Sequence, residues 1–233
     1  MPACGGGKQE PDPSAIAGTL ESEDPEARRM AAVALGKLGA KAKPAVPELQ
    51  KRVLDPDPEV RLAVVEALAA IGTDGRRGLA AALNDGDAKV REAAALGLAS
   101  LGPNAAPAVA NLIAALADEE TAVAEAARRA LVAVGADAVE GLLRELVNGT
   151  AATRNHATVA LSAVGEPALP GLILALEANE PDARKAALAA IATILESVTA
   201  PPELAPALRA CFADTDAKVA EAARRLHARV TKK

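Results

Sequence analysis

One block of sequence recurs along most of the chain. Each copy opens on an acidic or hydroxyl residue, often followed by Pro, and continues through an Ala-rich apolar run that often ends at Gly. The copies open at Asp24, Asp57, Asp87, Glu120, Thr150, Glu180 and Asp216, so successive starts lie 33, 30, 33, 30, 30 and 36 residues apart. Self-similarity at such a period is typical of repeat proteins, in which each unit packs mainly against its neighbours.

Within a copy, the apolar residues recur at helical spacing. In the copy that opens at Asp57 these residues are Val60, Ala63, Val64, Ala67, Leu68 and Ile71. Asp57 can cap the first free amides, Pro58 suits the first turn, and Gly72 can end the helix. Each copy is therefore predicted to form one amphipathic helix with a single buried stripe.

A second, shorter apolar segment precedes each such helix, for example at 47–54, 109–116 and 169–176. Each unit is thus predicted to be a helical hairpin, and no segment shows the sustained alternation expected of a strand. The sequence predicts an all-α, right-handed α-solenoid of about seven stacked helical hairpins. We expect residues 1–13 to be a disordered leader or tether, 14–230 the repeat domain, and 231–233 a tail.

Composition excludes several functions. The 233 residues include 61 Ala and one aromatic residue, Phe212, so the core must be built from small side chains. The net charge of -5 and the lack of aromatic platforms argue against a nucleic-acid partner. The uncharged stretch 93–117 is interrupted by Gly102 and Pro103, which argues against a membrane span.

These motifs resemble the HEAT-repeat family, particularly the short bacterial HEAT-like repeats related to the phycobilin lyase type. The resemblance rests on the Asp-Pro-Glu-Val-Arg opening at 57–61, the Ala-Leu-x-x-x-Gly close at 67–72, and prolines in the first helices, namely Pro44, Pro47, Pro107, Pro170 and Pro206. It extends over about residues 14–230 and implies a protein-binding scaffold. The family's ladder of Asp and Arg departs here at Ala124 and Ala220, which replace Arg, and at Thr150, which replaces the acid.

The ladder arginines are Arg28, Arg61, Arg91, Arg154 and Arg184. They could form a basic stripe for phosphate, because stacking brings equivalent positions of adjacent repeats together. Each Arg also lies four residues after a cap residue, where it can bind carboxylates of its own and the neighbouring repeat. The balanced charge favours this structural role.

Residues of the second helices that lie away from the buried stripe should line the inner, concave surface. One such row is Arg29, Leu62, Glu92, Glu125, Asn155, Lys185 and Glu221, and a parallel row is Val33, Glu66, Leu96, Arg129, Val159, Ala189 and Arg225. Apolar side chains among charged ones at exposed positions indicate small patches able to contact a protein or peptide partner. Tighter helix packing than assumed is the alternative explanation.

Nothing in the sequence predicts catalysis or a cofactor. The densest anomaly is Arg154-Asn155-His156, in which His156 occupies a row filled elsewhere mostly by Ala. No second His, Cys or paired carboxylate lies at catalytic or ligand spacing, so a structural histidine is favoured. The alternative is an enzyme or chaperone like the bilin lyases, with a tetrapyrrole in the concave groove, and it is disfavoured by the missing aromatic residues and the missing acid-base pair.

The N-terminal sequence leaves the compartment open. Met1-Pro2-Ala3-Cys4, followed by Gly-rich sequence, resembles the end of a bacterial lipoprotein signal without the apolar segment that should precede it. Lipidation of Cys4 would make this an envelope lipoprotein and would be its sole membrane contact, whereas a true start at Met1 would make it a cytoplasmic protein. We expect a monomer in either case.

Overall fold

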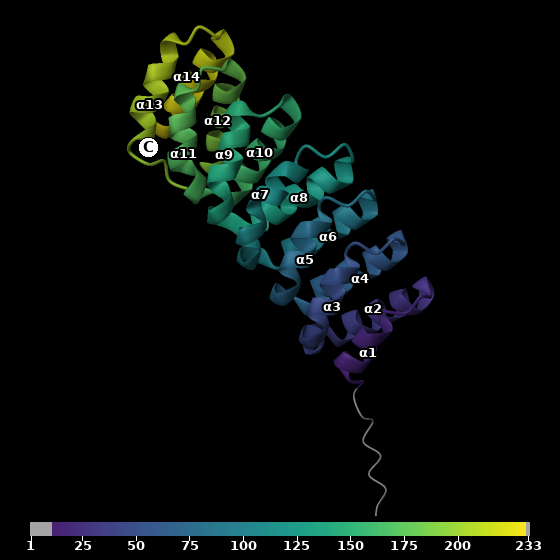
Figure 1. The fold of residues 1–233 in the computed structure, drawn as a ribbon. Coiled ribbons are helices and arrows are strands. Elements are labelled where there is room, and N and C mark those ends of the chain that lie inside the picture. The colour runs from purple at the N-terminus through teal and green to yellow at the C-terminus, as the bar shows by residue number, and fades with distance from the viewer. Residues whose placement is uncertain (1–10, 232–233) are drawn as a thin grey trace, which may run out of the picture. The chain divides into compact units, whose positions relative to one another are not determined.

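The computed structural model describes residues 11–231, and every regular element in that range is a helix (Figure 1). Short first helices alternate with longer second helices. The first helices are α1 (Pro13–Thr19), α3 (Val46–Arg52), α5 (Arg76–Ala82), α7 (Val109–Ala115), α9 (Val139–Asn148), α11 (Leu169–Leu174) and α13 (Leu204–Ala210). The second helices are α2 (Pro25–Leu38), α4 (Pro58–Ile71), α6 (Ala88–Ser100), α8 (Thr121–Val134), α10 (Ala151–Val164), α12 (Pro181–Ile194) and α14 (Ala217–Thr231). The predicted all-α solenoid fold of helical hairpins is confirmed.

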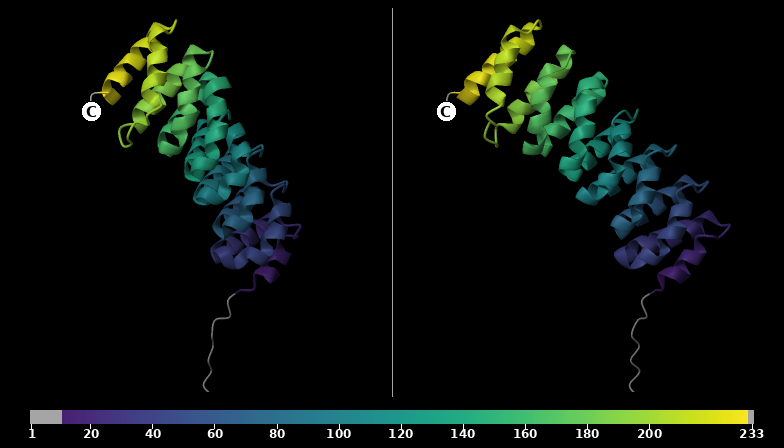
Figure 2. Two further views of the ribbon diagram at one scale, coloured as in Figure 1. Left: turned by 90° about the vertical axis from the view of Figure 1, so that its left-hand side faces the viewer. Right: turned by 60° about the vertical axis from the view of Figure 1, so that its left-hand side comes forward.

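The chain forms two compact units, Met1–Gly97 and Leu98–Lys233. In the N-terminal unit α2 packs on α4 and α3 packs on α5. In the C-terminal unit α8 packs on α10, α10 on α12, and α12 on α14, so that like helices of successive hairpins are neighbours (Figure 2). A single repeat domain over 14–230 stays a prediction, and residues 1–10 of the expected leader and 232–233 of the tail lie outside the described residues.

The second helices begin directly after the residues expected to cap them. Asp57 Oδ1 accepts the Glu59 amide at 2.8 Å, and Thr150 Oγ1 accepts the Thr153 amide at 3.2 Å. Glu120 and Glu180 stand at the same position, but neither side chain makes the capping hydrogen bond. The short Asp and Thr side chains are those that can fold back onto the first free amides.

A glycine with positive φ follows five of the second helices: Gly39, Gly72, Gly102, Gly135 and Gly165. This conformation strains any residue that carries a Cβ atom. The helix α12 ends differently, because Leu195, with φ of -71°, follows it. Residues 195–203 then connect α12 to the next hairpin without any α- or 3-10 helix. After Gly72 and Gly165, by contrast, a short 3-10 segment leads into the next hairpin.

The core is built from Leu side chains set among small residues. Leu35, Leu68 and Leu131 are fully buried, as are many Ala side chains along the second helices. At Gly36 of α2, a Cβ atom would lie 3.3 Å from the Cα atom of Ala67 in α4. The two backbones therefore approach closely, which a chain with larger side chains at these positions could not achieve.

Three of the ladder arginines join one hairpin to the next through a bidentate ion pair that is buried at Arg28 and partly buried at Arg61 and Arg184. Arg28 donates from Nε and Nη2 to the two carboxylate oxygens of Asp55 at 2.7 and 2.8 Å. Its Nη1 donates to the backbone carbonyls of Ser22 and Glu23, both at 3.0 Å, in its own hairpin. We call this arrangement the arginine clamp. All three guanidinium nitrogens donate hydrogen bonds in it, two of them to the carboxylate and one to the carbonyls.

The same clamp recurs in both units. Arg61 binds Asp85 at 2.7 and 2.9 Å in the N-terminal unit, and Arg184 binds Asp214 at 2.7 Å through both nitrogens in the C-terminal unit. Because each clamp binds a carboxylate of the following hairpin, the structural role predicted for these arginines is confirmed. The capping acid four residues upstream is not the ion-pair partner, so that part of the prediction was wrong.

The clamp is incomplete at two successive junctions of the C-terminal unit. Ala124 stands at the Arg position of α8, and Asn148 stands at the matching acid position two residues before the next cap. At the following junction Arg154 is present, but Ala178 replaces the acid. Arg154 instead donates to the carbonyls of Leu146 and Gly149, both at 2.9 Å, and so caps the end of α9 in its own hairpin.

The clamps at Asp55 and Asp214 lower the pKa of these two acids. Burial alone would raise the pKa of Asp55, but hydrogen bonds from Arg28 and from the Asp57 amide outweigh it and hold that pKa below its ordinary value. The hydrogen bonds from Arg184 are the main reason why the pKa of Asp214 is also lowered. Both acids are therefore charged in the folded protein at neutral pH.

We predict that Gly72→Ala lowers the free energy of unfolding by about 1 to 3 kcal/mol, the usual cost of a strained backbone conformation. A Cβ atom at Gly72 would meet nothing within 4 Å, so the loss would come from its φ of 95° alone. Urea denaturation followed by circular dichroism measures it, since the chain has no Trp or Tyr. Gly18→Ala is the control: its site is equally open, its φ is not positive, and it should raise stability. Equal effects of the two variants would contradict this reasoning.

We predict that Asp55→Asn lowers the free energy of unfolding of the N-terminal unit by about 3 kcal/mol, because it leaves the buried Arg28 guanidinium without its countercharge. The matched control is Asp74→Asn, which removes a surface ion pair with Lys43 and should have little effect. Urea denaturation of both variants checks this. If both variants unfold at the wild-type midpoint, the clamp does not stabilise the junction.

We predict that the clamps make stability depend on acid pH. The folded-state pKa of Asp55 and of Asp214 lies below the unfolded value of about 3.9. Their contribution is therefore complete above that value and is lost as pH falls through the folded pKa. Urea midpoints measured from neutral pH downward should fall less steeply below about pH 4 in the Asp55→Asn, Asp214→Asn double variant than in the wild type. Parallel curves would show that other acids dominate.

Candidate functional site

The two rows predicted to bind a partner lie at accessible positions of the second helices. We call these rows the second-helix face. In the N-terminal unit Glu66 and Leu96 are exposed, while Arg29, Val33, Leu62 and Glu92 are half-buried. In the C-terminal unit Glu125, Arg129, Asn155 and Val159 are exposed, and Lys185 is half-buried. The assignment of these residues to partner binding stays a prediction.

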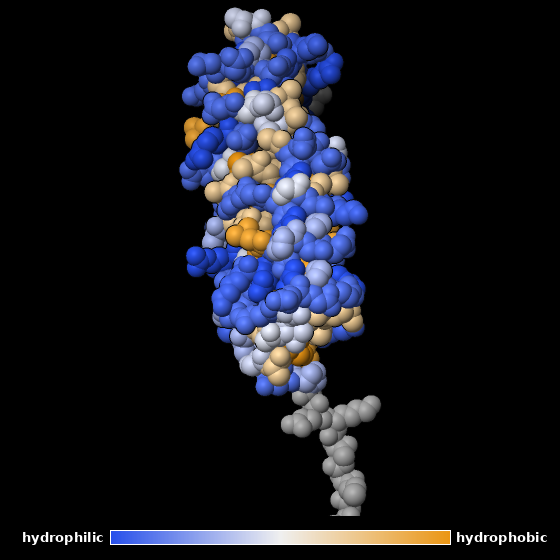
Figure 3. Space-filling view, turned by 45° about the vertical axis from the view of Figure 1, so that its right-hand side comes forward, coloured by the Kyte–Doolittle hydropathy of each residue, from blue (hydrophilic) through white to orange (hydrophobic). Residues whose placement is uncertain are grey.

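Two large apolar side chains on this face are open to solvent. Leu96 in the N-terminal unit is 41% exposed, and Val159 in the C-terminal unit is 44% exposed. Figure 3 shows one side of the molecule, on which apolar groups lie among a mostly hydrophilic surface. Leu62, by contrast, is half-buried against its neighbours, so tighter packing than the sequence indicated does apply at that position.

The second-helix face of the C-terminal unit contains a hollow between α12 and α14. It encloses about 420 Å³. The apolar part of its lining is Leu188, Ala189, Ala192, Ala222 and Leu226, and the charged part is Lys185, Lys218, Arg225 and Arg229. We call it the basic hollow. The sequence-based rows included Lys185, Ala189 and Arg225 but missed Lys218 and Arg229. On α14, Lys218 lies one helical turn before the row positions and Arg229 lies one turn after them.

Acids of the same helices hold two of these cations in place. Lys185 Nζ lies 2.7 Å from Asp182 Oδ1 and 3.4 Å from Asp216 Oδ2, and Arg225 pairs with Glu221. The hydrogen bond that Lys185 donates to Asp182 is the main reason why the pKa of Lys185 is raised. Lys185 is therefore protonated across the physiological range. Its position between two carboxylates fixes the edge of the basic hollow.

The anomalous Arg154-Asn155-His156 segment does not form a catalytic arrangement. Arg154 is engaged with backbone carbonyls, Asn155 is exposed, and His156 is half-buried on α10. Within residues 11–231, no group of three or more His, Cys, Asp and Glu side chains is placed to hold a metal ion. Thr158 Oγ1 donates to the Arg154 carbonyl at 2.7 Å, so this part of α10 is tied internally.

The second histidine, His227, packs in a small cluster at the end of the C-terminal unit. Its ring lies edge-on to Phe212, with centroids 5.2 Å apart, and its Nε2 accepts a hydrogen bond from Arg209 Nε at 3.0 Å. Arg224 lies 5.9 Å from the centroid of the same Phe212 ring. This cluster joins α13 to α14 and has a packing role.

The two cysteines fall in different regions. Cys211 is a buried free thiol, and burial raises its pKa, which makes it a poor nucleophile. Cys4, the expected lipidation site, lies outside the described residues. None of the helices in the described part of the chain is both long and apolar enough to cross a bilayer.

Comparison with known proteins agrees with the architecture. Residues 13–77 match the family described as HEAT repeats. No curated protein matches the sequence. An archaeal HEAT-like repeats protein from Thermococcus onnurineus NA1 is 15% identical, with a TM-score of 0.50 over 94% of this chain and 96% of that one.

Two further solved structures are similar. An engineered protein is 21% identical, with a TM-score of 0.51 over 94% of this chain and 68% of that one. The complex of CpcE and CpcF of phycocyanin lyase from Nostoc sp. PCC7120 is 25% identical, with a TM-score of 0.49 over 99% of this chain and 98% of that one. Residues 13–77 are therefore similar to HEAT repeats, and the chain has the fold of HEAT-like repeat proteins.

Proposed function

We propose that this protein is a non-catalytic scaffold in which the second-helix face of each unit can bind a protein or peptide partner. The HEAT-repeat fold fits an interaction scaffold. The observation that carries the proposal is the exposure of Leu96 and Val159 among charged residues of a face built from regular, repeated helices. Such a preformed surface can bind an extended segment through many shallow contacts, because the surface itself loses little conformational entropy on binding.

The basic hollow supports a more specific form of this proposal for the C-terminal unit. Its floor of Leu188, Ala189 and Ala192 can accept an apolar side chain. Lys218 and Arg229 at its edge can bind carboxylates that flank that side chain. We therefore expect the part of the partner segment that contacts the basic hollow to be acidic.

Selection of a random peptide library on the full-length protein tests the proposal. We expect enriched peptides whose binding is weakened at least about tenfold by Leu96→Glu or by Val159→Glu, because each change puts a charge into an apolar contact. Leu54→Glu is the control, since Leu54 is 86% exposed and lies outside the second-helix face. Circular dichroism and thermal melting should show that all three variants fold like the wild type.

Two outcomes would contradict the proposal. One is that no enriched peptide is sensitive to Leu96→Glu or to Val159→Glu. The other is that Leu54→Glu weakens binding as much as these two changes do. Leu62→Glu would not test the proposal, because the Leu62 side chain is half-buried and its loss of packing could not be told apart from a loss of binding.

A further inference from the structure

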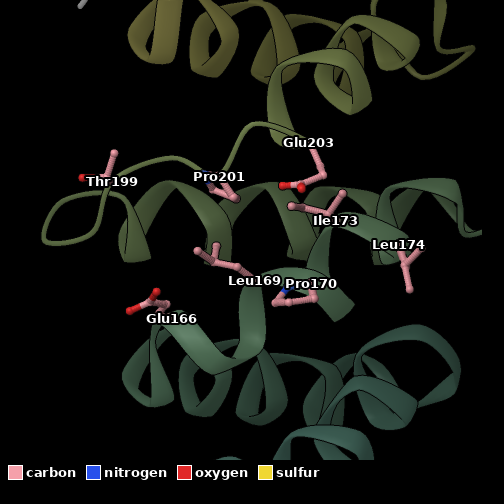
Figure 4. A pocket seen from close by; sticks show the side chains of 8 residues that line it. All are labelled: Glu166, Leu169, Pro170, Ile173, Leu174, Thr199, Pro201 and Glu203. Atoms are coloured by element: carbon pink, nitrogen blue, oxygen red, sulfur yellow. The ribbon is translucent and has the colours of Figure 1, made fainter.

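The C-terminal unit has an open apolar hollow on the side of the first helices. It lies between α11 and the connection 195–203, and it encloses about 510 Å³. Leu169, Pro170 and Ile173 of α11 line one wall, and Thr199, Pro201 and Glu203 line the other. Figure 4 shows Leu169 and Ile173 on the helix facing the connection that carries Pro201 and Glu203.

A second hollow adjoins the first across a single side chain, Leu174. It encloses about 380 Å³ and is lined by Leu143 and Val147 of α9 together with Gly171 and Leu174. Leu174 lines both hollows and is 70% exposed. We call the two hollows with Leu174 between them the Leu174 groove. Its residues all belong to the C-terminal unit.

Gly171 allows the floor of the groove to form. A Cβ atom at Gly171 would lie 2.0 Å from Leu143 Cδ1, so glycine lets the Leu143 side chain lie directly against α11. The result is a continuous apolar strip from α9 across α11 to Pro201. An exposed apolar strip of this kind indicates a site of contact with another molecule.

The charges around the groove are of one sign. Glu166 and Glu203 line the first hollow, and Glu177 lines the second, while neither hollow is lined by Lys or Arg. All three glutamates are exposed, and none forms an ion pair with another residue of the described chain. The rim is therefore negative and free to attract a cationic partner.

The connection that forms one wall is an irregularity of the repeat. It accounts for the 36-residue interval between Glu180 and Asp216, the longest between successive starts. No positive-φ glycine ends α12, and the segment that follows carries Pro201 and Pro202, which stiffen it. The added residues are thus held as a wall against α11 in place of a tight turn.

We propose that the Leu174 groove binds a segment of a partner protein in which large aliphatic side chains alternate with or are flanked by Lys or Arg. The aliphatic groups would fill the two hollows on either side of Leu174, and the basic groups would meet Glu166, Glu203 and Glu177. This surface is separate from the second-helix face, and the inference does not rest on the function proposed above. The two sites call for partners of opposite charge.

Fluorescence anisotropy with two labelled synthetic peptides of equal length tests the inference, one alternating Leu with Lys and one alternating Leu with Glu. We expect the Leu/Lys peptide to bind the full-length protein and the Leu/Glu peptide to bind at least about tenfold more weakly. Leu174→Glu should weaken binding of the Leu/Lys peptide at least about tenfold. The Glu166→Gln, Glu203→Gln double variant should weaken it about threefold or more and reduce its dependence on salt.

Matched controls separate this site from other acidic or apolar surfaces. Leu54→Glu places the same charge at another highly exposed leucine, in the N-terminal unit, and should leave the affinity unchanged. Leu96→Glu and Val159→Glu should also leave it unchanged, so that failure of the second-helix face and failure of the Leu174 groove give different results.

Three outcomes would overturn the inference. The first is an affinity for the Leu/Lys peptide that Leu174→Glu does not alter. The second is a wild-type dimer, seen by sedimentation, that Leu174→Glu converts to a monomer, which would assign the groove to a second copy of this chain. The third is Leu174-dependent binding of an uncharged fatty-acyl probe without binding of the Leu/Lys peptide, which would assign it to a small apolar ligand.

Discussion

Where a clamp is present, the stacking of one hairpin on the next depends on a guanidinium group that binds two hairpins at once. Arg28 holds the backbone carbonyls of its own loop with one nitrogen and the Asp55 carboxylate of the following hairpin with two others. Side chains as small as Ala and Gly pack without strongly specifying an angle, because they offer few interlocking contacts. The directional hydrogen bonds of the clamp supply that specification.

Much of the fold could be predicted from the sequence because helical hairpins carry local signals. The apolar spacing of residues 60–71, the Asp57 cap and the Gly72 stop are each set by interactions within one helix and its first and last turns. Glu120 and Glu180 show the limit of this reasoning, since they occupy the cap position without capping. The sequence shows where a helix begins, whereas the length of the cap side chain decides whether it can accept hydrogen bonds from the free amides of the first turn.

The parts that could not be predicted depend on contacts between segments. Asp55 lies two residues before the Asp57 cap, and its pairing with Arg28 becomes evident only when two hairpins are stacked. The candidate site follows the same pattern. The second-helix rows follow from periodicity, but Lys218 and Arg229 reach the basic hollow from positions outside those rows. The Leu174 groove depends on the path of residues 195–203. The 36-residue interval between repeat starts shows that residues are added here, but it does not predict the path that they take.

Two junctions of the C-terminal unit lack a clamp, so the resistance of this unit to bending should differ from one junction to the next. At Asp55, a small rotation of one hairpin against the next would break a buried ion pair. The hairpin of α9 and α10 can rotate against either neighbour without breaking such a pair, because Asn148 and Ala178 stand at the acid positions of its two junctions. Force applied along the repeats would thus concentrate its strain at this hairpin. The curvature of the unit would therefore change most easily at this hairpin.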